Sequence, residues 1–418
     1  MHMEIRTGRS GDAAAILRVT AAAFRREPHT NQWQHHKDEA ESAPDSFRLL
    51  SVDGTVAGVA RIQRHELRIG SCTIVLGDVG EVSTHPDFER RGLATRLMTD
   101  VVRYMREEGC HISRLGGFCR FYSRFGYVPF PRGYIAFTLR GQPSRGGLTD
   151  VGKALSESGN IAAVRTYDAV ADHGRRAELY ELFNACRTGA EVRAFGGPPV
   201  NAAEHPHRIV AERDGTMVGY MFCSAPQTGR GFAEPTAVIG EAAVDPARAE
   251  ALVPLLRHTL LQAHRDGARA VRARLPLDYA LYRYYREGSV GFAPTLMRTT
   301  ESSNMLRILD LRGLLAQIAP ELQTRLRESA VAGTTESLSL RVAAQSVRVR
   351  AARGRLRFPV KWARADAVPL EHTDLLHLLL GLHTVDDVTR GLPDIAPARK
   401  ALLAALFPAQ PTATGPWG

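Results

Sequence analysis

The chain of 418 residues lacks any run of about 18 apolar residues, the length that a membrane-spanning helix requires. Its first residues, MHMEIRTGRSGDAAAILRV, contain no apolar stretch followed by a cleavage site, so we expect no secretion signal. Cysteine is scarce, and no two cysteines have the CxxC spacing of zinc sites and redox motifs. The five cysteines are Cys72, Cys110, Cys119, Cys186 and Cys223. We therefore expect a reduced, cytoplasmic setting, with no metal site and no membrane insertion.

Lysine is nearly absent, with 4 residues against 50 arginines, and the formal net charge is +10. The arginines are spread through every segment, and no helix-turn-helix, RRM-like or basic-aromatic motif accompanies them. We therefore expect no nucleic-acid partner. With 44% hydrophobic and 23% charged residues, the composition is that of a globular protein, and the length predicts about three domains.

Residues 3–140 have the pattern of a mixed α/β unit. Strands are predicted at residues 3–6, 46–52, 56–65, 75–84, 112–115 and 134–139, and helices at residues 13–24, 93–108 and 118–125. The Asp53-Gly54 pair between alternating apolar runs predicts a hairpin turn. Residues 141–159 are rich in glycine and serine and predict a linker.

The segment after this linker repeats features of the first unit. DGTVAG at residues 53–58 reappears as DGTMVG at residues 214–219, and EVSTHP at residues 81–86 reappears as EAAVDP at residues 241–246. An aromatic pair follows in each copy, Phe121-Tyr122 in the first and Tyr284-Tyr285 in the second. Three matches in the same order and at nearly constant offset indicate a duplicated fold.

From about residue 304 the pattern changes again. MLRILDLRGLLAQIAP has apolar positions at helical spacing, and short alternating strands follow it before a helix at residues 372–382. The tail, KALLAALFPAQPTATGPWG, begins as a helix and ends in a proline-rich segment. These elements predict a third domain of α+β type. Its apolar run at residues 375–382 fits either a lipid-lined pocket or a buried core helix.

The stretch VSTHPDFERRGLATRL, residues 82–97, carries the clearest chemical signal. A strand stops before a proline, and an Arg-Arg-Gly turn leads into a helix. The N–H groups of a first helical turn lack partners within the helix, and with the helix dipole they favour an anion such as a pyrophosphate. The second copy continues as ARAEALVP without a glycine, so we expect that copy to have lost its ligand.

The run V-S-T-H-P-x-x-x-R-R-G-L-A resembles the acyl-CoA-binding motif of the GNAT N-acetyltransferases, and FYSRFGYVPF at residues 121–130 resembles the family's final helix and strand. The first motif position is Glu89, where the family usually has Gln or Arg, so we expect weaker electrostatics without loss of binding. The resemblance implies acetyl-CoA as the acyl donor. The implied donor-binding residues are Val82, Ser83, Thr84, Arg90, Arg91, Gly92, Leu93, Ala94 and Thr95.

The whole pattern resembles the enhanced intracellular survival (Eis) acetyltransferases. This resemblance implies mixed α/β sheets in two tandem GNAT-fold domains, the second degenerate, followed by a sterol-carrier-protein-like α+β domain. The implied ranges are 1–145 for the acetyltransferase domain, 160–300 for the degenerate domain and 304–418 for the third domain with its tail. A homo-oligomer, trimeric or hexameric, is implied as well.

The resemblance also implies catalytic residues. Tyr122 matches the tyrosine that faces the cofactor sulfur and can protonate the leaving thiolate. The carboxylate of Gly418 is the first candidate for the base, because in the family the chain's own terminus reaches back into the first site. Glu81 is the second candidate, although its recurrence as Glu241 in the copy without a phosphate turn favours a structural role.

Three further residues follow the first helix, where the family builds its acceptor pocket: Trp33, His35 and His36. They fit either substrate contact or an exposed loop. We expect an acetyl-CoA-dependent N-acetyltransferase that acts on a primary amine of a small cationic molecule, either aminoglycoside-like or antibiotic-related, with acidic residues around the acceptor. A polyamine or a protein lysine is an alternative acceptor. A lipid- or ligand-binding carrier with vestigial GNAT domains is the alternative from another class.

Overall fold

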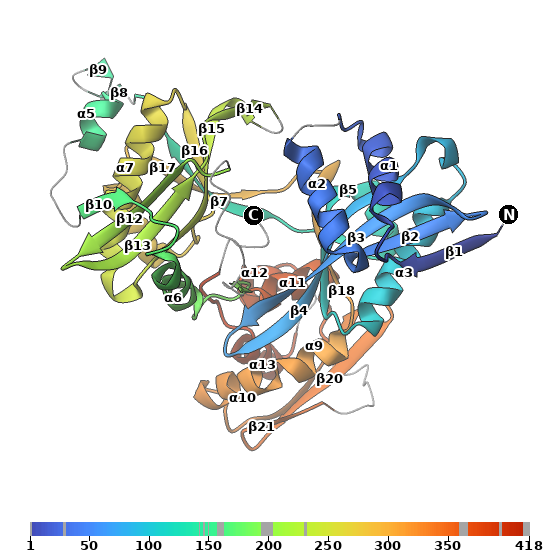
Figure 1. The fold of residues 1–418 in the computed structure, drawn as a ribbon. Helices are drawn as coiled ribbons and strands as arrows, with labels where there is room; N and C mark the ends of the chain where they lie inside the picture. The colour runs from blue at the N-terminus through green and yellow to red at the C-terminus, as the bar shows by residue number, and fades with distance from the viewer. Residues whose placement is uncertain are drawn as a thin grey trace.

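The computed structural model describes residues 2–27, 31–141, 143–144, 147–148, 150–156, 163–193, 204–229, 232–358, 367–392 and 395–412. Two mixed sheets stand side by side, each covered by helices, and a smaller domain lies below them (Figure 1). Within the described residues, no helix combines the length and the apolar character needed to cross a membrane. All five cysteines are free.

The first sheet, sheet A, has the strand order β1-β2-β3-β4-β5-β18-β6, with β11 on the outer edge of β3. Its strands are β1 (Met3–Thr7), β2 (Phe47–Val52), β3 (Thr55–Ile69), β4 (Cys72–Thr84), β5 (Ile112–Phe118), β6 (Val128–Pro129), β11 (Glu191–Val192) and β18 (Ser302–Ile308). β4 and β5 run parallel, and the other neighbouring strands are antiparallel. The predicted hairpin at Asp53-Gly54 is confirmed, and it joins β2 to β3.

Helices cover both faces of sheet A. α1 (Ala13–Phe24) and α2 (Asn31–Ser42) lie on one face, and α3 (Leu93–Glu107) lies on the other. Side chains along a strand alternate between faces, so Val59 of β3 packs with Ile16 of α1 while its neighbour Ala60 packs with Leu97 of α3. After the substrates that the resemblance leads us to expect there, the face of α1 and α2 is named the acceptor face and the face of α3 the donor face.

The second sheet, sheet B, repeats this plan with the order β10-β12-β13-β15-β16-β7-β17, and β14 pairs with β15. Its strands are β7 (Arg132–Thr138), β10 (Ala163–Thr166), β12 (His207–Arg213), β13 (Thr216–Cys223), β14 (Gln227–Gly229), β15 (Phe232–Val244), β16 (Ala270–Ala273) and β17 (Phe292–Met297). Its helices are α5 (Val151–Ser156), α6 (His173–Asn184), α7 (Leu252–Arg265) and α8 (Tyr282–Glu287). The predicted mixed α/β class with a duplicated unit is therefore confirmed.

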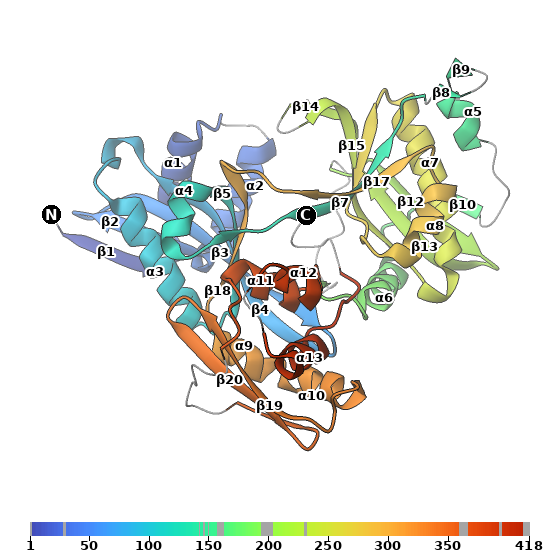
Figure 2. The same cartoon turned by 180° about the vertical axis from the view of Figure 1, so that it is seen from behind.

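The two sheets exchange one strand each. β7 follows β6 in the chain but lies between β16 and β17 of sheet B. β18 follows β17 but returns to lie between β5 and β6 of sheet A. Figure 2 shows both connections crossing between the sheets. The chain thus crosses from sheet A to sheet B at β7 and returns to sheet A at β18, and these two crossings tie the sheets together.

This exchange corrects three predictions. Residues 134–139 do not close the first unit, because they pair in sheet B, and residues 302–308 belong to sheet A and not to a third domain that starts at residue 304. The segment at residues 305–308 is a strand and not the start of a helix, since periodicity does not separate a fully buried strand from a buried helix. Within the predicted linker, α5 packs on α7 with Val151 and Leu155 buried.

The third domain lies beneath sheet A. It contains α9 (Leu311–Gln317), α10 (Ala319–Glu328), α11 (His372–Leu379), α12 (Val385–Thr389), α13 (Pro397–Leu406) and a small sheet of β19 (Thr335–Val342), β20 (Gln345–Ala352) and β21 (Arg355–Arg357). Its apolar core continues into the lower half of β3 and β4 through Leu67, Ile69 and Leu76. The run at residues 375–382 contributes buried leucines to that core.

Candidate active site

A gap opens in sheet A where β4 and β5 separate. These strands pair only from Leu76 opposite Ile112 to Val79 opposite Leu115, although both continue further. The pairing of β3 with β4 shifts register at the same level, and Glu81 has a φ of 53°, which marks a bulge. β18 pairs with β5 from Ile112 to Phe118 on the edge that faces away from β4, so it does not fill the gap. The carboxyl ends of two parallel strands thus diverge, which is where α/β proteins bind ligands.

The turn between β4 and α3 lies beside this gap on the donor face. His85 accepts a hydrogen bond from the N–H of Asp87, and Arg90 and Gly92 both adopt the left-handed conformation before α3 begins at Leu93. A Cβ on Gly92 would meet nothing within 4 Å, so a side chain would fit here. Glycine is favoured because it adopts the left-handed backbone conformation without strain. No side chain caps this end of α3. The predicted turn therefore presents uncapped N–H groups of the kind that bind phosphates.

Three arginines surround this turn. Arg90 is exposed, and Arg91 lies over the ring of Phe88 and donates to the carbonyl of Asp87 at 3.0 Å. Arg124, from the short 3-10 turn after α4 (Cys119–Tyr122), has Nη2 3.4 Å from Oγ1 of Thr95 in the first turn of α3. Arg124 was not among the residues predicted from the sequence. Its position two residues after Tyr122 in YSRFGY is the signal that identifies it.

Tyr122 lies across the gap from the turn, at the end of α4. Its ring packs on Gly117 so closely that a Cβ there would be 2.3 Å from Cε2, and Phe121 meets it edge-on at 4.9 Å. Burial raises the pKa of Tyr122 to about 12. The phenol is therefore protonated near neutral pH and can serve as an acid. Of the strand residues predicted to bind the donor, Ser83 is buried and Val82 and Thr84 are half-buried.

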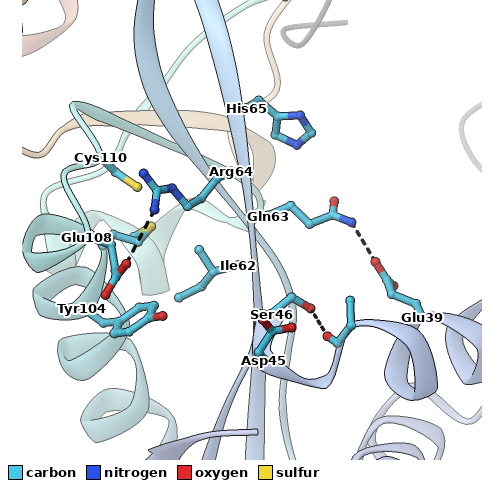
Figure 3. A pocket seen from close by; sticks show the side chains of 12 residues that line it. Glu39, Asp45, Ser46, Ile62, Gln63, Arg64, His65, Tyr104, Glu108 and Cys110 are labelled. Carbon is cyan, nitrogen blue, oxygen red and sulfur yellow. Dashed lines mark hydrogen bonds and ion pairs between the residues drawn. The ribbon is translucent and has the colours of Figure 1, made fainter. Parts of the chain in front are cut away.

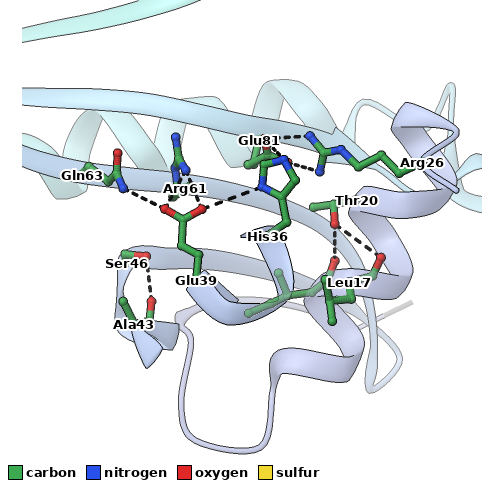
Figure 4. Close-up of polar contacts among 11 residues, drawn as sticks. Leu17, Thr20, Arg26, His36, Glu39, Ala43, Ser46, Arg61, Gln63 and Glu81 are labelled. Carbon is green, nitrogen blue, oxygen red and sulfur yellow. Dashed lines mark hydrogen bonds and ion pairs between the residues drawn. The ribbon is translucent and has the colours of Figure 1, made fainter. Parts of the chain in front are cut away.

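A chain of ionic contacts lies on the acceptor face (Figure 4). Arg26 donates to both carboxylate oxygens of Glu81, at 2.6 and 2.9 Å, and Arg61 pairs with Glu39 at 2.6 Å. His36 stands between the two carboxylates, 3.9 Å from each. Burial lowers the pKa of His36, although the carboxylates oppose this effect. The structure thus brings His36 and Glu81 together.

The other two residues predicted near the acceptor lie on the same helix. His35 is exposed, with its ring centroid 5.6 Å from that of His36. Trp33 is half-buried, and Nζ of Lys37 lies 5.8 Å from its ring centroid. The structure therefore joins His36 to the ionic network and leaves His35 at its margin. Gly418, the first candidate for the base, lies outside the described residues.

A cavity of about 490 Å³ opens at the edge of β3, between residues that follow α2 on one side and the end of α3 on the other (Figure 3). β2 pairs with β3 as far as Arg61 and β11 pairs only at residues 66–67, so the edge between them has no partner strand in the described chain. Glu39 and Gln63 line this cavity, and Arg64 pairs with Glu108 across it. Neither Tyr122 nor the turn before α3 contributes to it.

The second copy lacks both features of the donor face, the left-handed turn before the helix and the tyrosine beside a gap. After Asp245 the chain forms a 3-10 helix, Pro246–Ala251, that runs directly into α7, and no residue in this described stretch is left-handed. This 3-10 helix is kinked at Arg248, and the N–H groups of Arg248 and Leu252 donate to carbonyls within the stretch. Tyr285, the counterpart of Tyr122 in the repeat, is fully buried and donates to the carbonyl of Pro276 at 3.0 Å. Glu241 nevertheless pairs with Arg176 as Glu81 pairs with Arg26.

No group of three metal-ligating side chains occurs among the described residues. Residues 4–130 match the family described as Acetyltransferase (GNAT) domain. No curated protein matches the chain.

Several solved structures share nearly the whole fold. A probable N-acyltransferase from Enterococcus faecalis V583 is 12% identical with a TM-score of 0.72, and covers 99% of this chain and 98% of its own. A GCN5-related N-acetyltransferase from Kribbella flavida is 18% identical with a TM-score of 0.68, with coverage of 98% and 97%. Eis1 from Mycobacterium abscessus is 19% identical with a TM-score of 0.63, and 99% of each chain is covered. Residues 4–130 therefore form a GNAT acetyltransferase domain, and the fold of the whole chain is similar to that of Eis1.

Proposed function

We propose that this protein is an acetyl-CoA-dependent N-acetyltransferase that works in its first domain and acts on a primary amine. The difference between the two copies carries the proposal. The first copy has a left-handed glycine directly before α3 and a tyrosine beside the gap, whereas the second has a 3-10 helix, kinked at Arg248, that leads into α7 and a tyrosine in its core. A carrier with vestigial domains has no physical reason to keep the first arrangement.

The residues around the gap fit the donor. The N–H groups that follow Gly92 suit its pyrophosphate, and Arg90, Arg91 and Arg124 add positive charge at the same turn. Beyond Val79, the edge of β4 that faces β5 has no partner strand among the described residues. Its backbone groups at residues 82–84 are therefore available to the pantetheine arm.

The transfer needs an acid for the leaving thiolate and a base for the attacking amine. The amine nitrogen attacks the thioester carbonyl, the new C–N bond forms and the C–S bond breaks. Tyr122 gives its proton to the leaving thiolate and recovers one from solvent, and the surplus proton of the amine passes to the base. The phenol suits the acid because it is protonated at neutral pH.

His36 suits the base better than Glu81 among the described residues. Both oxygens of Glu81 already accept hydrogen bonds from Arg26, so this carboxylate is held in place by a cation. His36 has no such pairing with an arginine, and its lowered pKa keeps the imidazole neutral at pH 7. The Gly418 carboxylate remains a prediction from the resemblance, as does a small cationic or antibiotic-related acceptor.

Calorimetry with acetyl-CoA tests the proposal directly. We expect the wild-type protein to bind and Gly92→Glu to lose binding, because the new carboxylate lies at an anion site. Gly109→Glu is the matched control: Gly109, just beyond the other end of α3, has almost the same φ, 74° against 73°, and a Cβ on it also meets nothing within 4 Å. Absence of binding to the wild-type protein would favour the carrier function instead. A thiol-release assay with a library of amines then identifies the acceptor.

A further inference from the structure

Two consecutive glycines of β5 show which groups reach the gap from each face. Tyr122 occupies the space beside Gly117, whereas Nη2 of Arg132 lies 3.6 Å from the position that a Cβ on Gly116 would take. Consecutive strand residues point to opposite faces of a sheet. Arg132 therefore approaches the gap from the acceptor face, opposite the tyrosine and the turn that fits the donor's phosphates.

A second arginine reaches this region from the other sheet. Arg274 directly follows β16, and its N–H donates to the carbonyl of Ile239 at 2.9 Å. Arg132 begins β7, the exchanged strand that pairs with β16, so the two guanidinium groups come from neighbouring strands of sheet B. The pKa of Arg274 is lowered by desolvation and then by the charges of Arg114, Arg193 and Arg132. Three arginines therefore lie within electrostatic range of Arg274 where the two sheets meet.

The carboxylates near these arginines are already paired. Arg114 donates to both oxygens of Asp78, Glu39 pairs with Arg61, and Glu81 pairs with Arg26. On the side of sheet B, Glu241 accepts hydrogen bonds from Arg176 and Arg193, and Glu191 pairs with His65 and Arg193.

Arg132 and Arg274 differ from the arginines around them. Both are exposed, and neither makes a hydrogen bond or ion pair with a described residue. The acidic lining expected for a purely cationic acceptor is thus not what the described residues provide. The charge that remains unpaired beside the gap is the positive charge of these two guanidinium groups.

We propose that Arg132 and Arg274 form an anion-binding subsite for the acceptor, so that the acceptor carries a carboxylate or a phosphate in addition to its reactive amine. Two guanidinium groups that repel each other and lack a partner gain most from an anion shared between them, and their planar donor pattern matches either group. This inference rests on the proposed acetyl transfer and specifies its substrate class.

Matched pairs of amines test the subsite in a thiol-release assay on the full chain. Lysine and cadaverine differ by a carboxylate, and O-phosphoethanolamine and ethanolamine differ by a phosphate. We expect a higher kcat/KM for the anionic member of at least one pair, and the pair that responds identifies the anion. Arg132→Gln and Arg274→Gln should lower kcat/KM for that member by about 10- to 100-fold, as for the loss of a charged hydrogen bond, and leave its partner unchanged.

Arg350→Gln, at an exposed position of β20 in the third domain, is the matched control for the loss of one arginine. Acetyl-CoA calorimetry and a thermal melt on each variant confirm that the donor site and the fold are intact. If Arg132→Gln and Arg274→Gln lowered kcat/KM equally for both members of a pair, the subsite would be overturned. The two arginines would then bind an anionic group of the protein itself and not one of the acceptor. Equal use of both members by the wild-type protein would overturn it too. Absence of acetyl-CoA binding, or of acetylation of every amine tested, counts instead against the proposed function.

Discussion

Gly116 and Gly117 occupy adjacent positions in β5, yet they tolerate a side chain very differently. A methyl group on Gly117 would overlap the ring of Tyr122, whereas one on Gly116 would make an ordinary contact with Arg132. We expect Gly117→Ala to displace the tyrosine and cost about 1–3 kcal/mol of stability, with a large loss of kcat. Gly116→Ala is the control, with a melting temperature close to that of the wild-type protein. Equal melting temperatures and kcat for the two variants would contradict this packing.

Tyr122 itself gives the second residue-scale prediction. Tyr122→Phe removes the proposed proton donor, so kcat should fall by about 10²- to 10⁴-fold with the acetyl-CoA affinity unchanged. Because burial raises the pKa of Tyr122 to about 12, its ionisation should not reduce kcat until the pH approaches that value. Stopped-flow or steady-state thiol release measures both effects.

Tyr285→Phe is the control from the second copy. It removes a buried hydrogen bond to the carbonyl of Pro276, so it should cost about 1 kcal/mol of stability and leave kcat unchanged. If Tyr122→Phe keeps the full kcat, the thiolate receives its proton from another group.

At the scale of elements, α11 docks on sheet A through a titratable contact. Nε2 of His372 accepts a hydrogen bond from the N–H of Ile308 in β18 at 3.0 Å, and burial lowers the pKa of His372 to about 4. A depressed folded pKa means that this stabilisation is complete above the unfolded value near 6.5 and is lost as the pH falls toward 4. The loss is on the order of 3 kcal/mol for a shift of this size.

His372→Gln should make stability less sensitive to pH over that window, because the amide oxygen can accept the same hydrogen bond without titrating. Urea unfolding at pH 7 and pH 4.5 measures the effect, and His35→Gln at an exposed position is the control. A pH dependence as steep as that of the wild-type protein would contradict the role of His372.

Individual turns and helices could be predicted from the sequence, but the pairing of strands that are distant in the chain could not. The turn at Asp53-Gly54 and helix α1 follow from nearest-neighbour preferences, and the structure confirms both. The turn at Gly92 was predicted from residues within one short stretch. Arg132 and Arg274 were missed because nothing in a linear pattern shows that β7 pairs with β16. Tyr122 was selected through the family motif alone.

At the scale of the whole molecule, the exchanged strands predict that both acetyltransferase-like domains unfold together. β7 and β18 each complete the other domain's sheet, so neither sheet survives the loss of its neighbour. Leu256→Ala in α7, a fully buried position of the second domain, should cost about 2–5 kcal/mol. We expect calorimetry to show one transition for both domains, shifted to lower temperature, and acetyl-CoA binding to be lost in the same transition. A donor site that melts at the wild-type temperature would contradict this coupling.

The return of β18 to sheet A also has a consequence during synthesis on the ribosome. β18, the neighbour of β5 on the edge away from the gap, emerges about 170 residues after β7, and at about 5–20 residues per second this delay is roughly 10–30 seconds. Until then, the edge of β5 that faces away from β4 has no strand to pair with. A truncated nascent chain therefore cannot complete the first site, and acetylation begins only after the second domain has been translated.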